Sequence, residues 1–123
     1  MNTNVKPILV VDDDPEIREL LTVFLEEKGF NVTTAPDGLQ VMDRIHHDMP
    51  SIVIMDLVLP GKPGIPLVRS IKATYAIPLI IISGIYKREE IVDLIEECKV
   101  EGFLDKPIDL HRLMDIVNSI INA

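Results

Sequence analysis

Five short apolar runs alternate along the chain with longer segments of helical periodicity, and this alternation limits the possible folds more than any other feature. The runs cover residues 8–11, 31–35, 51–55, 78–82 and, more weakly, 101–105. Four of the five are apolar, or nearly so, on both faces, as expected for strands of a parallel sheet that helices cover on both sides. The pattern predicts an α/β fold of five βα units, with right-handed crossovers that place helices on both faces of the sheet.

The segment after the first run has the clearest helical pattern. Five apolar residues keep the i, i+3, i+4, i+7, i+8 spacing of one helix face: Ile17, Leu20, Leu21, Phe24 and Leu25. Asp14 is the expected N-cap, Pro15 the first helical residue and Gly29 the end of the helix. Similar apolar stripes at residues 41–45, 68–71, 91–95 and 110–121 each predict a further helix.

Length and composition indicate one domain over residues 1–123 that folds without disulfides. The chain has 123 residues, of which 47% are hydrophobic, and a net charge of −8. That charge repels nucleic-acid backbones and anionic membranes, so we expect neither as a direct partner. A single cysteine, Cys98, and a start, "MNTNVKP", without a long apolar run favour the reducing cytoplasm. The longest apolar stretches are too short to cross a bilayer.

Polar residues follow four of the five runs. Asp12, Asp13 and Asp14 follow the first run, and Asp56, Ser83 and Lys106 follow the third, fourth and fifth. Open parallel sheets bind ligands beyond the carboxyl ends of their strands, so we expect these groups to converge at one edge. Clustered carboxylates repel unless a proton or a cation lies among them, and Mg²⁺ prefers oxygen ligands and often shares a phosphate. With a lysine, a hydroxyl and a carboxylate nucleophile nearby, the set suits phosphoryl transfer through an aspartyl phosphate.

The stretches "ILVVDDDPEIRELL", "IVIMDLVLPGKPG", "IPLIIIS" and "GFLDKP" together resemble the receiver domain of two-component response regulators. The resemblance extends from Pro7 to about Ile121. It implies a flavodoxin-like, doubly wound parallel sheet with strand order 2-1-3-4-5. It also implies a cis peptide bond between Lys106 and Pro107.

The same resemblance implies a role for each residue of the expected site. Asp56 is the phosphoacceptor. The Mg²⁺ site consists of Asp12, Asp13, Asp56 and the backbone carbonyl of Val58, with Asp12 acting mainly through water. Ser83 and Lys106 bind the phosphoryl group, and Ser83 and Phe103 form the switch. The adjacent Asp14 is expected to cap the helix that follows.

Four positions depart from the family pattern. Ser83 replaces the commoner threonine, and Lys99 lies at or near a usual glycine, which predicts a reshaped loop before the last strand. Val58 and Ile85, each two places after a key residue, are apolar where polar side chains often align the attacking water. We therefore expect slow self-dephosphorylation.

The resemblance implies a signalling switch and not a metabolic enzyme. A histidine kinase or a histidine phosphotransfer protein would donate the phosphoryl group. The downstream target would be an effector protein or an output domain missing from this chain. The fourth helix, fifth strand and fifth helix would form the surface that contacts it. The chain would be a monomer or a weak dimer.

Three other functions compete with this one. "VVDDD" also contains an Asp-x-Asp, as in small phosphatases similar to haloacid dehalogenases with Asp12 as nucleophile, but Glu16 stands where that family wants threonine or valine. A flavin-binding flavodoxin needs a phosphate loop after the first strand, and three aspartates there repel bare phosphate. A degenerate receiver that only binds partners is disfavoured because each phosphorylation residue is present.

Overall fold

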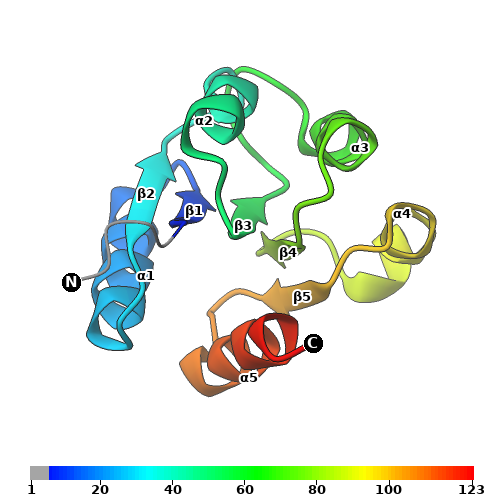
Figure 1. Cartoon of the computed structure of the whole chain (residues 1–123). Coiled ribbons are helices and arrows are strands. Elements are labelled where there is room, and N and C mark those ends of the chain that lie inside the picture. The colour runs from blue at the N-terminus through cyan, green and yellow to red at the C-terminus, as the bar shows by residue number, and fades with distance from the viewer. Residues whose placement is uncertain (1–5) are drawn as a thin grey trace.

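Five parallel strands form one sheet in the computed structural model, which describes residues 6–123. The strands lie in the order β2-β1-β3-β4-β5 (Figure 1), as the resemblance implies. Their bounds are β1 (Ile8–Val11), β2 (Val32–Ala35), β3 (Ile52–Asp56), β4 (Leu79–Ser83) and β5 (Gly102–Asp105). Each strand lies within one residue of its expected run. The predicted α/β class and strand order are therefore confirmed.

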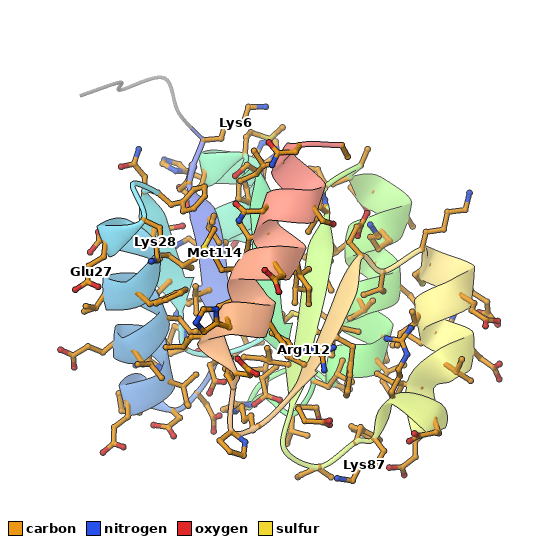
Figure 2. All side chains as sticks on the ribbon, turned by 90° about the horizontal axis from the view of Figure 1, so that it is seen from below. Lys6, Glu27, Lys28, Lys87, Arg112 and Met114 are labelled. Atoms are coloured by element: carbon orange, nitrogen blue, oxygen red, sulfur yellow. The ribbon has the colours of Figure 1, made fainter. Side chains whose placement is uncertain are left out.

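The helices cover both faces of this sheet. Their bounds are α1 (Pro15–Glu27), α2 (Val41–Asp48), α3 (Gly64–Thr74), α4 (Val92–Cys98) and α5 (Leu110–Ile121), and a 3₁₀ turn, η1 (Arg88–Ile91), precedes α4. Helices α1 and α5 lie on one face, and α2, α3 and α4 lie on the other (Figure 1). Lys28 and Met114 line a hollow between α1 and α5 (Figure 2).

The core has two halves because successive strand residues point to opposite faces of the sheet. In β1, Leu9 and Val11 pack in the half that includes α2, α3 and α4, while Ile8 and Val10 pack against α1 and α5. All four side chains are completely buried. This two-sided burial explains why the first run has no polar residue until Asp12.

Local sequence signals set the bounds of α1. The Asp14 side chain caps the helix by accepting a hydrogen bond from the Glu16 N–H at 2.9 Å, and Pro15 begins the helix. Gly29 follows the helix with a φ of +94°, a conformation that favours glycine. Leu20 differs from the expectation, since 44% of it is exposed at the margin of the apolar stripe.

The end of α4 also differs from the expectation. Lys99 adopts a left-handed conformation with φ of 55°, and its N–H binds the Ile95 carbonyl. A lysine thus takes the geometry of the usual glycine, at a cost of about 1 kcal/mol, and the loop keeps a normal helix end. The predicted reshaping of this loop is therefore wrong.

Within residues 6–123, no helix combines the length and apolar character that crossing a membrane requires. The first five residues, part of the start "MNTNVKP" on which the expectation of a cytoplasmic chain partly rests, lie outside the described residues.

Candidate functional site

The carboxyl edge of the sheet brings together the polar residues singled out in the sequence. Asp12 follows β1, Asp56 ends β3, Ser83 ends β4 and Lys106 follows β5. One carboxylate oxygen from each of Asp12, Asp13 and Asp56 lies within 4.8 Å of the others. The parallel register causes this convergence, since all five strands end at the same edge.

Asp12 is the most deeply buried of the three acids, with no exposed surface. Its N–H binds the Ala35 carbonyl at 3.2 Å, which fixes it beside β2. Its Oδ1 accepts a hydrogen bond from the Asp14 N–H at 2.9 Å, and its Oδ2 lies 2.8 Å from Lys106 Nζ. The side chain is therefore anchored through both oxygens.

Lys106 joins two of the carboxylates. Its Nζ lies 2.8 Å from Asp12 Oδ2 and 2.7 Å from Asp56 Oδ2, and its side chain is 21% exposed. Its backbone N–H donates to the Ser83 carbonyl at 2.9 Å, which continues the pairing of β4 and β5. The Lys106–Pro107 peptide bond is cis, as the resemblance implies. The ammonium group thus lies inside the acidic cluster.

Ser83 and Asp56 each organise the loop that follows them. Asp56 Oδ1 accepts the Val58 N–H at 2.9 Å. Ser83 Oγ accepts the N–H groups of Ile85 at 3.2 Å and Tyr86 at 2.9 Å. A hydroxyl that accepts two hydrogen bonds still has its own proton to donate. Ser83 can therefore hold its loop and bind an incoming oxygen.

Burial and charge act in opposite directions on the buried acid. Burial raises the pKa of Asp12 above its ordinary value of 3.8, and the Asp56 charge adds to this, although the contacts with the Lys106 ammonium group and the Asp14 N–H lower it. Burial also tends to lower the pKa of Lys106, but its contacts with Asp12 and Asp56 outweigh that effect and the pKa rises. The cluster therefore contains more negative charge than one ammonium group compensates.

The residues present fit a hard divalent cation. Oδ2 of Asp12 is buried and accepts no well-aligned hydrogen bond among residues 6–123, despite its ion pair with Lys106. Three carboxylates with oxygens within 4.8 Å of one another form an all-oxygen donor set, which Mg²⁺ prefers over nitrogen or sulfur ligands. This acidic cluster could therefore hold such an ion.

The raised pKa of Asp12 predicts that its charge destabilises the metal-free fold. The folded protein binds more protons than the unfolded chain, so the contribution of Asp12 to stability falls as pH rises from the unfolded pKa through the higher folded one. At pH 7 without Mg²⁺, we expect Asp12→Asn to raise the free energy of unfolding by about 1 kcal/mol. Urea denaturation measures the change, with exposed Asp13→Asn as a control expected to stay within about 0.5 kcal/mol. A less stable Asp12→Asn protein would contradict the prediction.

The remaining expected site residues lie around the cluster. The Phe103 side chain is 6% exposed and packs in the core half that includes α3 and α4. Val58 and Ile85 are 45% and 68% exposed on the loops that follow β3 and β4. Apolar side chains thus border the site on two of its loops.

The sequence reasoning missed one residue that contacts this site. Arg18, in the first turns of α1, donates from Nη1 to the Asp12 carbonyl at 2.7 Å. Only its position, six residues after Asp12 on a helix that starts beside the acids, could have indicated the contact.

Comparisons with known proteins identify the family. The model of the "Response regulator receiver domain" family matches residues 8–118. DNA-binding response regulator MtrA of Mycolicibacterium smegmatis is 35% identical over 116 residues, which are 93% of this chain and 50% of that protein. Transcriptional regulatory protein CseB of Streptomyces coelicolor is 36% identical, over 93% of this chain and 48% of its own. The chain thus spans about half the length of these relatives.

Solved structures agree with this result. A response regulator receiver protein from Pseudomonas putida superposes with a TM-score of 0.85 at 31% identity, over 96% of this chain and 99% of its own. These similarities give no support to the alternative of a small phosphatase using Asp12. The chain belongs to the response regulator receiver domain family of two-component systems.

Proposed function

We propose that Asp56 accepts a phosphoryl group at a Mg²⁺ site formed by Asp12, Asp13, Asp56 and the carbonyl of Val58. One observation carries the proposal: the Asp56 carboxylate belongs to a residue that is only 5% exposed, lies 2.7 Å from Lys106 Nζ, and has an oxygen within 4.8 Å of an oxygen of each of the two acids after β1. A nucleophilic carboxylate beside a cation-binding cluster and a fixed ammonium group suits in-line phosphoryl transfer.

Each side chain has a defined task in this reaction. A carboxylate oxygen of Asp56 forms the new bond to phosphorus as the bond from phosphorus to the donor nitrogen or oxygen breaks. Bound Mg²⁺ supplies positive charge to the carboxylates and the phosphoryl oxygens. The ammonium group of Lys106, already 2.7 Å from Asp56 Oδ2, binds a phosphoryl oxygen, and the Ser83 hydroxyl donates to another. The fixed carboxylate of Asp12 would orient water ligands of the metal ion, and the exposed Asp13 would bind the ion from the solvent side.

The switch couples Ser83 to the loop before α4. Ser83 Oγ holds the Ile85 and Tyr86 N–H groups, so its movement toward a phosphoryl oxygen changes the support of this loop. Phe103, in the neighbouring strand, is the second switch residue of the proposal. The surface that responds is that of α4, β5 and α5.

The partners in this proposal are a histidine kinase or histidine phosphotransfer protein as donor, and an effector protein or output domain as target. The names of the relatives above support an output domain, since they describe a DNA-binding regulator and a transcriptional regulator. With a net charge of −8, this chain itself is a poor ligand for DNA. We also propose that the protein is cytoplasmic and that it is a monomer or a weak dimer.

Labelling by acetyl phosphate tests the function. The purified chain is incubated with acetyl phosphate in Mg²⁺ or in excess EDTA, and intact mass and peptide mapping after borohydride reduction locate the modification. We expect one phosphoryl group on Asp56 in Mg²⁺ and almost none in EDTA. Modification elsewhere would overturn the assignment, and steady turnover of a phosphate monoester would favour a phosphatase.

The apolar side chains at positions 58 and 85, beside the site, predict a long-lived phosphorylated state. Val58 and Ile85 offer no hydrogen bond to a water that attacks phosphorus, whereas an amide at position 58 does. We expect Val58→Asn to shorten the lifetime of the phosphorylated protein about fivefold, the effect of one hydrogen bond of about 1 kcal/mol in the transition state. Val23→Asn, an exposed substitution on α1, is the matched control and leaves the lifetime unchanged. An equal or longer lifetime in Val58→Asn would contradict the prediction.

A further inference from the structure

The turn between β1 and α1 presents two of the acids very differently. Asp12 has no exposed surface and is held through its N–H, its carbonyl and both carboxylate oxygens. Asp13 is exposed, although one of its oxygens lies within the acidic cluster. The direction of the Asp13 side chain therefore depends mainly on the backbone that carries it.

Two hydrogen bonds fix the peptide planes on either side of Asp13. The Asp13–Asp14 plane is fixed through the Asp14 N–H, which donates to Asp12 Oδ1 at 2.9 Å. The Asp12–Asp13 plane is fixed through the Asp12 carbonyl, which accepts Arg18 Nη1 at 2.7 Å. Because a peptide unit is planar, fixing its carbonyl oxygen also fixes the direction in which the next Cα leaves. Arg18 thus controls one of the two planes that aim Asp13.

The hydrogen bond from Arg18 to the Asp12 carbonyl is strong enough to hold the turn in place. A short hydrogen bond from a guanidinium group to a carbonyl is charge-assisted and stronger than a neutral one. Arg18 is half-buried, and its own N–H binds the Asp14 carbonyl at 3.1 Å, so it belongs to the same first turn of α1 that Asp14 caps. Arg18 therefore links α1 to the acidic turn at two points, the Asp12 carbonyl and the Asp14 carbonyl.

We propose that Arg18 is a positioning residue for the Mg²⁺ site, acting through the Asp12 carbonyl to aim the Asp13 carboxylate. The inference rests on the proposed function for the presence of Mg²⁺. Residues that orient metal ligands without touching the metal typically change affinity 10- to 100-fold when they are removed.

The sign of the effect separates positioning from simple electrostatics. A guanidinium group near a cation site repels the cation, so removing it without any positioning effect strengthens Mg²⁺ binding. A purely structural role lowers the stability of the fold and leaves the Mg²⁺ affinity of the folded protein unchanged. Only a positioning role makes binding weaker.

The experiment is a titration with Mg²⁺ alone, followed by backbone amide chemical shifts, with circular dichroism to confirm folding. We expect Arg18→Met to bind Mg²⁺ about tenfold more weakly than the wild type. Arg18→Lys, which keeps a cationic donor, recovers part of the affinity. Arg112→Met, on α5 (Figure 2), removes the same charge from an exposed side chain and keeps the affinity within about twofold of the wild-type value.

Unchanged or tighter binding by folded Arg18→Met would overturn the inference, as would Arg18→Lys binding more weakly than Arg18→Met. If Arg18→Met does not fold, Arg18→Gln takes its place, since its shorter neutral side chain also loses the contact. No phosphoryl donor is present in the titration. Failure of Asp56 to accept phosphate is therefore seen separately, in the labelling experiment, and a wild-type chain that binds no Mg²⁺ overturns the inference itself.

Discussion

Asp56→Asn should abolish Mg²⁺-dependent labelling by acetyl phosphate, lowering the labelling rate at least ~100-fold. The amide keeps the size of the carboxylate but loses the nucleophilic oxygen that forms the bond to phosphorus. Its carbonyl can still accept the Val58 N–H, which Asp56 Oδ1 accepts at 2.9 Å, so the loop after β3 keeps its support. The measurement is the rate of mass gain at saturating Mg²⁺.

A matched control separates nucleophile loss from charge loss. Asp105 ends β5, is exposed and pairs with Ser83 in the sheet register, so Asp105→Asn removes one negative charge at the same edge. We expect Asp105→Asn to keep labelling within about threefold of the wild type, because the change is solvent-screened. Labelling of Asp56→Asn at the wild-type rate would show that another residue is the acceptor.

Gly64→Ala should lower the free energy of unfolding by about 3 kcal/mol, the upper range for forcing a methyl group into filled space. Gly64 begins α3, and a Cβ built on it would clash with the Leu57 carbonyl oxygen and lie 2.6 Å from two other backbone atoms of Leu57. Backbone atoms cannot rotate away as a side chain can. Either α3 or the loop after Asp56 must therefore move.

The same displacement reaches the proposed site, because residues 57 and 58 directly follow Asp56. We expect weaker Mg²⁺ binding in Gly64→Ala alongside the lower denaturation midpoint in urea. Gly84→Ala is the control, since its Cβ would meet Lys106 side-chain carbons at an ordinary 3.6 Å, and we expect a change within about 0.5 kcal/mol. Equal stability of the two variants would contradict the packing argument.

The sequence predicted the fold well where one local signal was sufficient. The five runs placed the strands within one residue, and four of them did so because burial on both faces admits few polar residues. Asp14 and Pro15 placed the start of α1 correctly. The strand order came only from the family resemblance, since periodicity does not say which strands are neighbours.

Other features depended on contacts that no local pattern contains. The apolar stripe of α5 includes Ile121, but this residue ends the helix and is 49% exposed. Spacing alone treated Ile91 as part of a helix, whereas it ends the 3₁₀ turn η1. Lys99 shows that a helix end can hold a lysine in a left-handed conformation that its own preference disfavours, with its N–H bonded to the Ile95 carbonyl.

The site could be predicted as a set of residues but not as a geometry. Asp12, Asp56, Ser83 and Lys106 follow predicted strands, and parallel pairing alone brings such positions to one edge. The sequence does not show that one ammonium group reaches two carboxylates, nor that Arg18 binds the Asp12 carbonyl. Both depend on the rotamers of long side chains, which only the packed structure defines.

Among the five strands of this sheet, β1 is synthesised first and yet lies in the interior of the sheet. Ile8 of β1 lies between Val32 of β2 and Ile52 of β3 in the strand register. A nascent chain that ends before residue 52 can pair β1 on one side only, and its other edge stays open to wrong partners. Vectorial synthesis therefore leaves one edge of β1 without its partner strand until β3 has been made.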